Sequence, residues 1–244
     1  MSREDSATLR LAQDIDLSRI PRDSSLRGRR NLTGNARLLE NDQQTQGEFF
    51  YQGVPMSELK FYKNMMLLGR AIDACLEKKL YGPALILIYS AIDVVGWLDS
   101  VEQYASPTSF KNWVEAYLLK ATSIPCTALE LYAARCGLLH TFTPDSKLSS
   151  KGPVRRICYC GGEASIQKLQ RTINLTKKPE LYVAVHINDL YEAWRLGVLH
   201  FAEELEKDPD KRSRVYAKAR KFFSVLSIGY VDEVLTILEK DKAP

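Results

Sequence analysis

One segment of this sequence is apolar on nearly every side when it is drawn as a helix. It spans residues 83–101 and reads PALILIYSAIDVVGWLDSV. A helix without a broad polar face has to be surrounded by other elements, because exposing any side of it to water is unfavourable. We therefore predict a mainly α-helical bundle with this helix at its centre.

The segments around it have the spacing of amphipathic helices. Ser57 is placed to cap the first of them, which then repeats apolar residues every three or four positions, and Pro144 ends the one that begins after Pro125. These helices are predicted over residues 57–80, 106–120, 126–142, 190–207, 211–226 and 230–240.

Two short segments between the helices have strand character. Residues 154–160 (VRRICYC) and 180–187 (ELYVAVHI) alternate in polarity or are β-branched, and Gly161-Gly162 between them favours a turn. We therefore predict a helical bundle over 57–145. Residues 146–244 are predicted to form a basic β-hairpin from the two strands, as an insertion or extension, followed by C-terminal helices. Both pack on this bundle.

The first 48 residues differ from the rest of the chain. They are rich in Ser, Asp, Arg, Asn and Gln, and their charges balance. Such a segment buries little, so we expect it to stay mobile until it meets a protein partner. The first residues, MSREDSATLR, lack the apolar stretch that a secretory signal needs, and the longest apolar run, Ala84–Tyr89, is far too short to cross a bilayer. The expected compartment is the cytoplasm, with no membrane partner.

Cysteine and charge patterns narrow the chemistry. The five cysteines are odd in number, and Cys158 and Cys160 are too close for a zinc knuckle, so we expect reduced thiols, no metal and no cofactor. Basic residues outnumber acidic ones eight to two over 147–182 and seven to two over 207–221. These segments predict either a polyanion-facing surface or two solvated faces. In the first case the candidate nucleic-acid-binding residues are Arg155, Arg156, Lys177 and Lys178.

Acid–base chemistry near neutrality has few candidates, because the chain contains only three histidines. Two of them follow an arginine by five positions: Arg135 with His140, and Arg195 with His200. Five residues on an ideal helix rotate by about 500°, which leaves the two side chains roughly 140° apart. They converge only if the arginine reaches round or if the helix is loosened, which Gly137 would permit.

The first pair lies in a context that resembles the HEPN superfamily. LILIYSAIDVVGWL (85–98) is followed by YAARCGLLHTFTP (132–144), which carries the Arg-x4-His pattern of that superfamily at Arg135 and His140. The resemblance covers about residues 57–145 and implies a compact helical bundle. It also implies a metal-independent endoribonuclease, acting as a toxin or in antiviral defence, that forms a homodimer in which two motifs face one cleft.

The chemistry of RNA cleavage agrees with these residue types. Cleavage without a metal needs a base for the 2′-hydroxyl, an acid for the leaving oxygen and a cation for the phosphorane. In the role that the resemblance implies, Arg135 holds the phosphate and His140 transfers protons. Asp93 would orient the arginine or make only a local hydrogen bond, and Ser90 is a weaker candidate for support.

A non-catalytic role is the alternative. The superfamily often has a polar residue directly after the motif arginine, where this chain has Cys136. That difference favours a HEPN-like module that binds RNA, a nucleotide or a partner protein. Salt-dependent RNA binding without cleavage distinguishes this module from an enzyme.

Overall fold

A computed structural model describes residues 56–151 and 154–223 of the 244-residue chain. The predicted mobile segment 1–48 and the predicted helix 230–240 lie outside the described residues. The elements, in chain order, are α3 (Met56–Glu77), α4 (Tyr81–Asp99), α5 (Pro107–Trp113), the π-helical turn η3 (Val114–Leu118), α6 (Leu119–Ala121), α7 (Ala128–Thr141), α8 (Lys147–Lys151), β1 (Arg156–Cys160), α9 (Ile166–Asn174), the 3-10 turn η4 (Pro179–Leu181), β2 (Tyr182–His186), α10 (Ile187–Lys207) and α11 (Pro209–Ala219).

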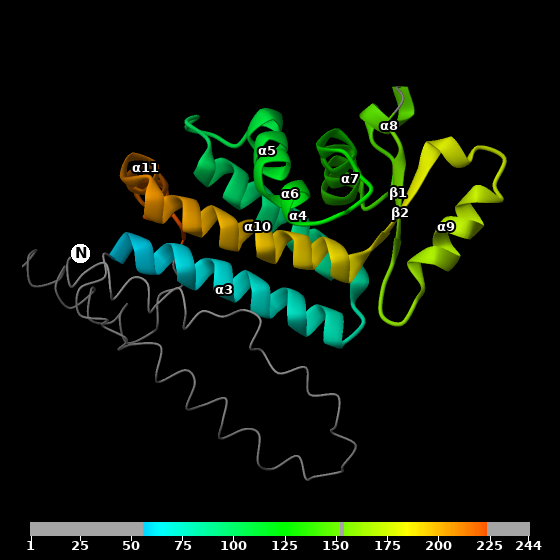
Figure 1. Cartoon of the computed structure of the whole chain (residues 1–244), viewed down its shortest axis with the longest axis horizontal. Coiled ribbons are helices and arrows are strands. Elements are labelled where there is room, and N and C mark those ends of the chain that lie inside the picture. The colour runs from blue at the N-terminus through cyan, green and yellow to red at the C-terminus, as the bar shows by residue number, and fades with distance from the viewer. Residues whose placement is uncertain (1–55, 152–153, 224–244) are drawn as a thin grey trace, which may run out of the picture.

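The apolar helix α4 lies at the centre of a helical bundle, as its sequence predicts. It contacts α3, α5, α7, α10 and α11 (Figure 1). Tyr89, Ile92 and Leu98 on α4 are fully buried, so the helix supplies much of the core. By length and composition α4 is also the one helix among the described residues that would suffice to cross a membrane, and half of it is buried inside the bundle. The mainly α-helical fold class is confirmed.

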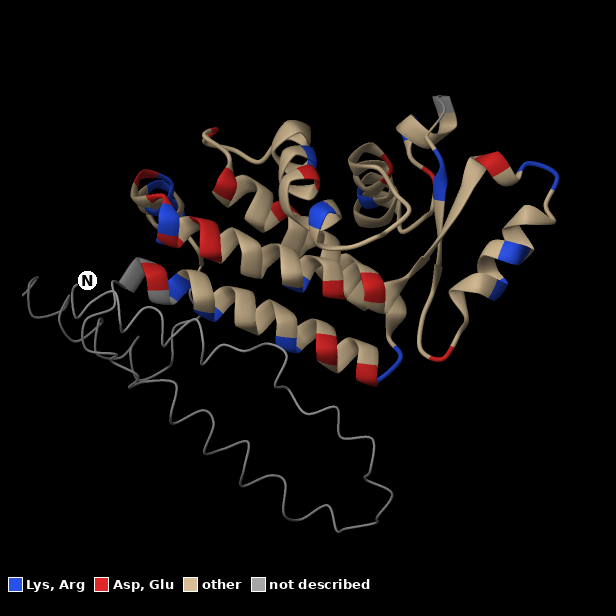
Figure 2. Ribbon diagram, in the orientation of Figure 1, with Lys and Arg blue, Asp and Glu red and all other residues tan. Residues whose placement is uncertain are grey.

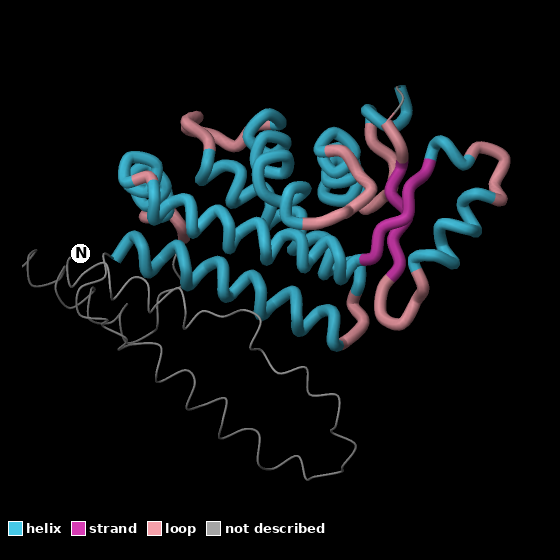
Figure 3. Tube along the Cα trace, in the orientation of Figure 1, coloured by secondary structure: helices cyan, strands magenta, loops and turns pink. Residues whose placement is uncertain are grey.

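The strand pair is present, but the predicted hairpin is wrong. β1 and β2 run parallel, with Arg156 opposite Tyr182 and Cys160 opposite His186. Parallel neighbours cannot be joined by a tight turn and need a crossover. Helix α9 supplies it and packs on both strands, at one end of the bundle (Figure 3). Gly161-Gly162 therefore leads into a helix, with Ser165 capping its first turn.

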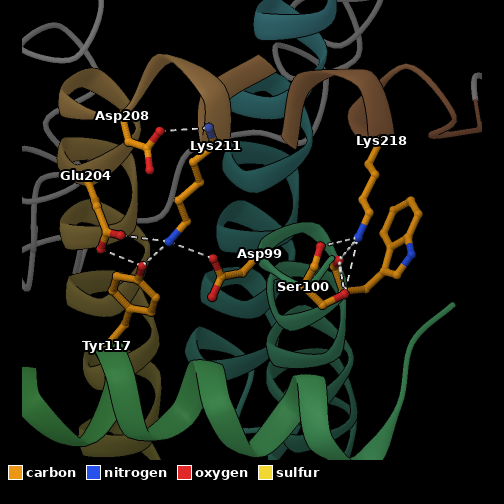
Figure 4. Close-up of polar contacts among 8 residues, drawn as sticks. Asp99, Ser100, Tyr117, Glu204, Asp208, Lys211 and Lys218 are labelled. Atoms are coloured by element: carbon orange, nitrogen blue, oxygen red, sulfur yellow. Dashed lines mark hydrogen bonds and ion pairs between the residues drawn. The ribbon is translucent and has the colours of Figure 1, made fainter. Parts of the chain in front are cut away.

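The basic segment 207–221 turns two of its lysines inward. The Nζ atom of Lys211 on α11 lies 2.8 Å from Asp99 Oδ1, 2.8 Å from Glu204 Oε1 and 2.7 Å from the hydroxyl of Tyr117 (Figure 4). Its side chain is 12% exposed. This ammonium group therefore joins α11 to α10, η3 and the end of α4, and is not free to face a polyanion.

Lys218 on α11 completes this attachment. Its Nζ atom donates to the carbonyl oxygens of Trp97 and Ser100, at 2.6 Å each, and lies over the indole ring of Trp97 (Figure 4). The last carbonyl groups of an α-helix have no partner within the helix, and a cation satisfies them well. Lys218 therefore caps the carboxyl end of the central helix, so two of the seven cations of this segment serve packing.

Candidate functional site

Helix α7 carries the predicted motif, and its start is fixed by a capping box. The Thr127 hydroxyl accepts from the Glu130 N–H, and the Glu130 carboxylate accepts from the Thr127 N–H. Thr-x-x-Glu ahead of an apolar run is a signature of a helix start, so this boundary follows from the sequence. The helix remains α-helical from Ala128 to Thr141, through both motif positions.

The structure brings Asp93, Arg135 and His140 together. Nε of Arg135 donates to Oδ2 of Asp93 on α4 at 2.7 Å, and Nη1 of Arg135 lies 3.4 Å from Nε2 of His140. The Arg135 and Asp93 side chains are 22% and 21% exposed, and His140 is exposed. An arginine always donates, so Nε2 of His140 accepts here and a neutral imidazole carries its proton on Nδ1. The site therefore opens to solvent on the histidine side.

Charge at this site is set by a balance of burial and pairing. Burial raises the pKa of Asp93, although the Arg135 hydrogen bond and charge work against the rise. Burial alone would lower the pKa of Arg135, but the hydrogen bond to Asp93 and its charge raise it instead. The guanidinium is therefore a fixed cation, positioned by a carboxylate that approaches only its Nε edge.

The close approach of Arg135 to His140 does not come from a loosened helix. With α7 regular across both positions, the long arginine side chain has to reach round to the imidazole. Gly137 has a different task, because the chain turns back over it after the helix ends. A Cβ atom there would lie 2.6 Å from the Thr143 carbonyl oxygen and 2.7 Å from that of Asp145. The glycine therefore allows the segment after α7 to pack on the helix backbone.

Ser90 and Cys136 lie beside the central three residues. Ser90 is half-buried and precedes Asp93 by one helical turn on α4. Cys136 is also half-buried. Burial raises the pKa of Tyr132, and a side-chain hydrogen bond with Cys136 raises it further. Cys136 also contributes to the raised pKa of Arg135, through a side-chain hydrogen bond and its charge. Among the described residues, no hydrogen bond joins Ser90 to Arg135 or His140.

The second Arg-x4-His pair does not converge in the same way. Nη1 of Arg195 lies 3.0 Å from Oε2 of Glu192, and its guanidinium lies over the ring of Tyr191. His200 is exposed on α10, and across the described residues no contact joins it to Arg195. Equal spacing in sequence thus gives a candidate site in one helix, and in the other an ion pair of Arg195 with Glu192 that involves no histidine.

The third histidine, His186, caps a helix. Its Nδ1 accepts from the Asn188 N–H at 3.2 Å, and its Nε2 lies 3.2 Å from the Gly162 carbonyl oxygen. It borders an open pocket of about 270 Å³ at the carboxyl end of β2, together with Asp189 and Glu192. Because both ring nitrogens are engaged, the structure gives His186 a role in the start of α10.

The adjacent arginines 155 and 156 hold the two ends of α7. Arg155 binds Glu130 through Nε at 2.5 Å and through Nη2 at 3.0 Å, at the start of the helix. Nε of Arg156 lies 2.5 Å from Oδ1 of Asp145, in the segment that follows the helix. Neighbouring residues of an extended chain point to opposite sides, so the two guanidiniums reach different ends of α7. Both predicted nucleic-acid-binding arginines thus make ion pairs that position the motif helix.

The ion pair of Arg155 with Glu130 makes part of the unfolding free energy depend on pH. Burial alone would raise the pKa of Glu130, but its bonds to Arg155 and Thr127 hold it below the usual 4.5. A carboxylate whose pKa is lower in the folded than in the unfolded protein contributes its full stabilisation above pH 4.5. This contribution of Glu130 disappears as the pH falls through its lowered pKa. We expect Glu130→Gln to cost about 2 kcal/mol of unfolding free energy at neutral pH.

Urea unfolding of both proteins at several pH values tests this expectation. The difference between wild type and Glu130→Gln should be large at pH 7 and should shrink below pH 4.5. Glu163→Gln is the matched control, because Glu163 is exposed in the turn before α9 and should show no such difference at any pH. A pH-independent cost at Glu130 would contradict the ionic explanation.

Lys177 and Lys178 are placed differently from the two arginines. Both are exposed in the turn between α9 and η4, and no ion pair engages either of them among the residues that the structure describes. The same described ranges contain no group of three His, Cys, Asp or Glu side chains placed to hold a metal ion.

No family model, curated protein or solved structure matches this chain. The resemblance to the HEPN superfamily therefore rests on the residues quoted above and stays a prediction.

Proposed function

We propose that this protein is a metal-independent endoribonuclease of the HEPN type, acting as a toxin or defence protein. The observation that supports it most is the contact chain from Asp93 through Arg135 to His140. Asp93 is the one charged residue inside the central stretch 82–98 of the most apolar helix, where burial disfavours its charge. A carboxylate kept there at a cost in stability is typical of a functional position.

The geometry suits phosphoryl chemistry. With Nε bound to Asp93 and Nη1 next to the exposed His140, the Nη groups have no carboxylate partner among the described residues, and a phosphate would receive two parallel N–H donors from them. The 3.4 Å contact with His140 is long, so a phosphate oxygen can replace it at little cost. The imidazole would then lie beside the scissile group.

The proposed reaction is an in-line transesterification. The 2′-oxygen forms a bond to phosphorus while the bond from phosphorus to the 5′-oxygen breaks. One imidazole takes the 2′-proton, and a second, protonated imidazole gives a proton to the departing 5′-oxygen. The products are a 2′,3′-cyclic phosphate and a 5′-hydroxyl. Arg135 stabilises the charge that develops on the phosphorane oxygens.

A single chain offers one motif histidine, so the two proton transfers favour a homodimer with two motifs in one cleft. The surface around the site supports such pairing. Leu87 and Val94 on α4 and Leu138 and Leu139 on α7 are only partly buried. A second copy that covered these apolar side chains would bring two Arg135–His140 pairs together.

The alternative is a HEPN-like module that binds RNA, a nucleotide or a partner protein without cleaving RNA. The half-buried thiol of Cys136 beside Arg135 favours it, since the superfamily often places a polar residue there. The enzyme and an RNA-binding module both predict binding of RNA, but only the enzyme predicts new 2′,3′-cyclic phosphate ends. Absence of RNA binding would point to a protein partner.

The deciding experiment incubates single-stranded RNA with the purified full chain in EDTA. The enzyme proposal expects cleavage with 2′,3′-cyclic phosphate ends, at a rate that rises more steeply than the first power of protein concentration near the dimer dissociation constant. Salt-dependent binding with intact RNA would support the module in its place. Cleavage that Arg135→Ala or His140→Ala leaves unchanged would exclude this site.

A further inference from the structure

The crossover helix α9 presents a basic face that packing does not use. Its apolar side, which includes Ile166, Leu169 and the buried Ile173, lies against the strand pair. Lys168 and Arg171 are exposed on the other side. Among the described residues, neither cation takes part in an ion pair, in contrast to Arg155, Arg156 and Lys211.

The basic face continues beyond the end of the helix. Lys177 and Lys178 follow in the adjoining turn, and the stretch 164–179 contains no acidic residue. Leu175, between the two pairs of cations, is 81% exposed. Figure 2 shows these cations as separate blue segments along α9 and the turn after it. No carboxylate lies between them in the sequence, and Glu163 and Glu180 flank the stretch. We call Lys168, Arg171, Lys177 and Lys178 the α9 strip.

We propose that the α9 strip binds the phosphate backbone of single-stranded RNA, as a second contact surface beside the Arg135–His140 site. The inference rests on the proposed function for the choice of RNA as the polyanion. Lys168 and Arg171 lie one helical turn apart on α9, and long lysine and arginine side chains in such a series can each approach a phosphate of an extended strand. Within the described residues no ion pair holds any of the four cations, so their charges are available to such a chain.

The position of the strip predicts how long the RNA has to be. The strand pair lies between α7 and α9, with β1 against α7 and both strands against α9 (Figure 1). Two layers of about 10 Å each separate the axes of α7 and α9, and the strip lies about 5 Å further out, on the side of α9 that faces away from the strands. A strand that touches both surfaces therefore needs at least about eight stacked nucleotides. Shorter RNAs should reach the Arg135–His140 site without the help of the strip.

The test measures binding of a fluorescent single-stranded RNA of about twenty nucleotides, ample for the span. Full-length His140→Ala is the background, so that the RNA stays intact. The strip variant is Lys168→Gln, Arg171→Gln, Lys177→Gln and Lys178→Gln together. The matched control is Lys63→Gln, Arg70→Gln, Lys78→Gln and Lys120→Gln, which removes the same charge from exposed positions elsewhere.

The strip variant should bind the RNA at least tenfold more weakly at 0.1 M salt, and its salt slope should fall by about two to three units. The control should keep both values. Equal effects of the two variants, no binding by the background protein, or equally tight binding of polyglutamate would overturn the proposal.

The proposed function is tested separately by cleavage of a tetranucleotide. The strip is out of reach of so short an RNA, so the strip variant with His140 intact should cleave it like wild type. If the tetranucleotide is cleaved but the strip variant binds the longer RNA with an unchanged salt slope, only the strip proposal is contradicted. If the strip variant shows the expected loss of binding but wild type cleaves no RNA, only the enzyme proposal is contradicted.

Discussion

Arg135→Ala and His140→Ala should each slow RNA cleavage at least a hundredfold in the presence of EDTA. The arginine supplies the charge that the phosphorane requires, and loss of such a group typically costs about two to three orders of magnitude in rate. The histidine supplies proton transfer, which contributes a similar factor. Both side chains are at least partly exposed, so truncation should leave the fold intact. Initial rates at saturating RNA measure the effect, with circular dichroism as the check on folding.

The chain offers its own control for this prediction. His200 follows Arg195 at the same spacing, is exposed on a helix and has no arginine contact within the described part of the chain. His200→Ala should therefore cleave like wild type. Asp93→Asn should have an intermediate effect, because asparagine can still accept from Nε of Arg135 but no longer supplies the charge. Equal losses in His140→Ala and His200→Ala would mean that neither histidine acts at a specific site.

Gly137→Ala should be among the most destabilising single substitutions in the described part of the chain. The new methyl group would overlap two backbone oxygens, at 2.6 and 2.7 Å, and neither belongs to a side chain that can rotate away. Overpacking of this kind costs about 3 kcal/mol, which lowers Tm by roughly 6–12 °C for a protein of this size. Thermal unfolding followed by circular dichroism measures the shift.

Gly69→Ala in α3 is the matched control. A Cβ atom there meets the Tyr191 hydroxyl at 3.4 Å, which is ordinary contact. Alanine also favours a helix interior over glycine by up to about 1 kcal/mol, so Tm should stay or rise slightly. A fall in Tm at Gly69 as large as at Gly137 would show that helix glycines are generally required here and that the turn over Gly137 is not special.

Most of the helical fold follows from the sequence, and the parallel strands do not. Amphipathic spacing and capping residues are local signals, so α3, α4, α7 and α10 lie close to their predicted ranges. The direction of β2 depends on what joins it to β1. The crossover helix α9 has a local signal, since Ser165 precedes apolar residues at 166, 169 and 173, but Gly161-Gly162 favours a turn just before it.

The candidate site shows the same division. The context of Arg135 distinguishes it from Arg195, and the structure places Asp93 and His140 against the first arginine alone. Residues five apart face different sides of an ideal helix, so the approach of Arg135 to His140 depends on how the arginine side chain bends round the helix, which the sequence alone does not show. The pairing of Arg155 with Glu130 joins residues 25 positions apart, so no local pattern predicts it. A count of charges along the sequence therefore does not separate Arg155 and Arg156, which form ion pairs, from the cations of the α9 strip, which form none among the described residues.

The two adjacent arginines make the hold on α7 depend on the register of β1. One reaches Glu130 and the other reaches Asp145 because they point to opposite sides of an extended backbone. A shift of β1 by one residue against β2 would reverse both directions at once and detach the motif helix at both ends. Over evolution, the pairing of Arg156 with Tyr182 across the two strands should therefore resist any change of register.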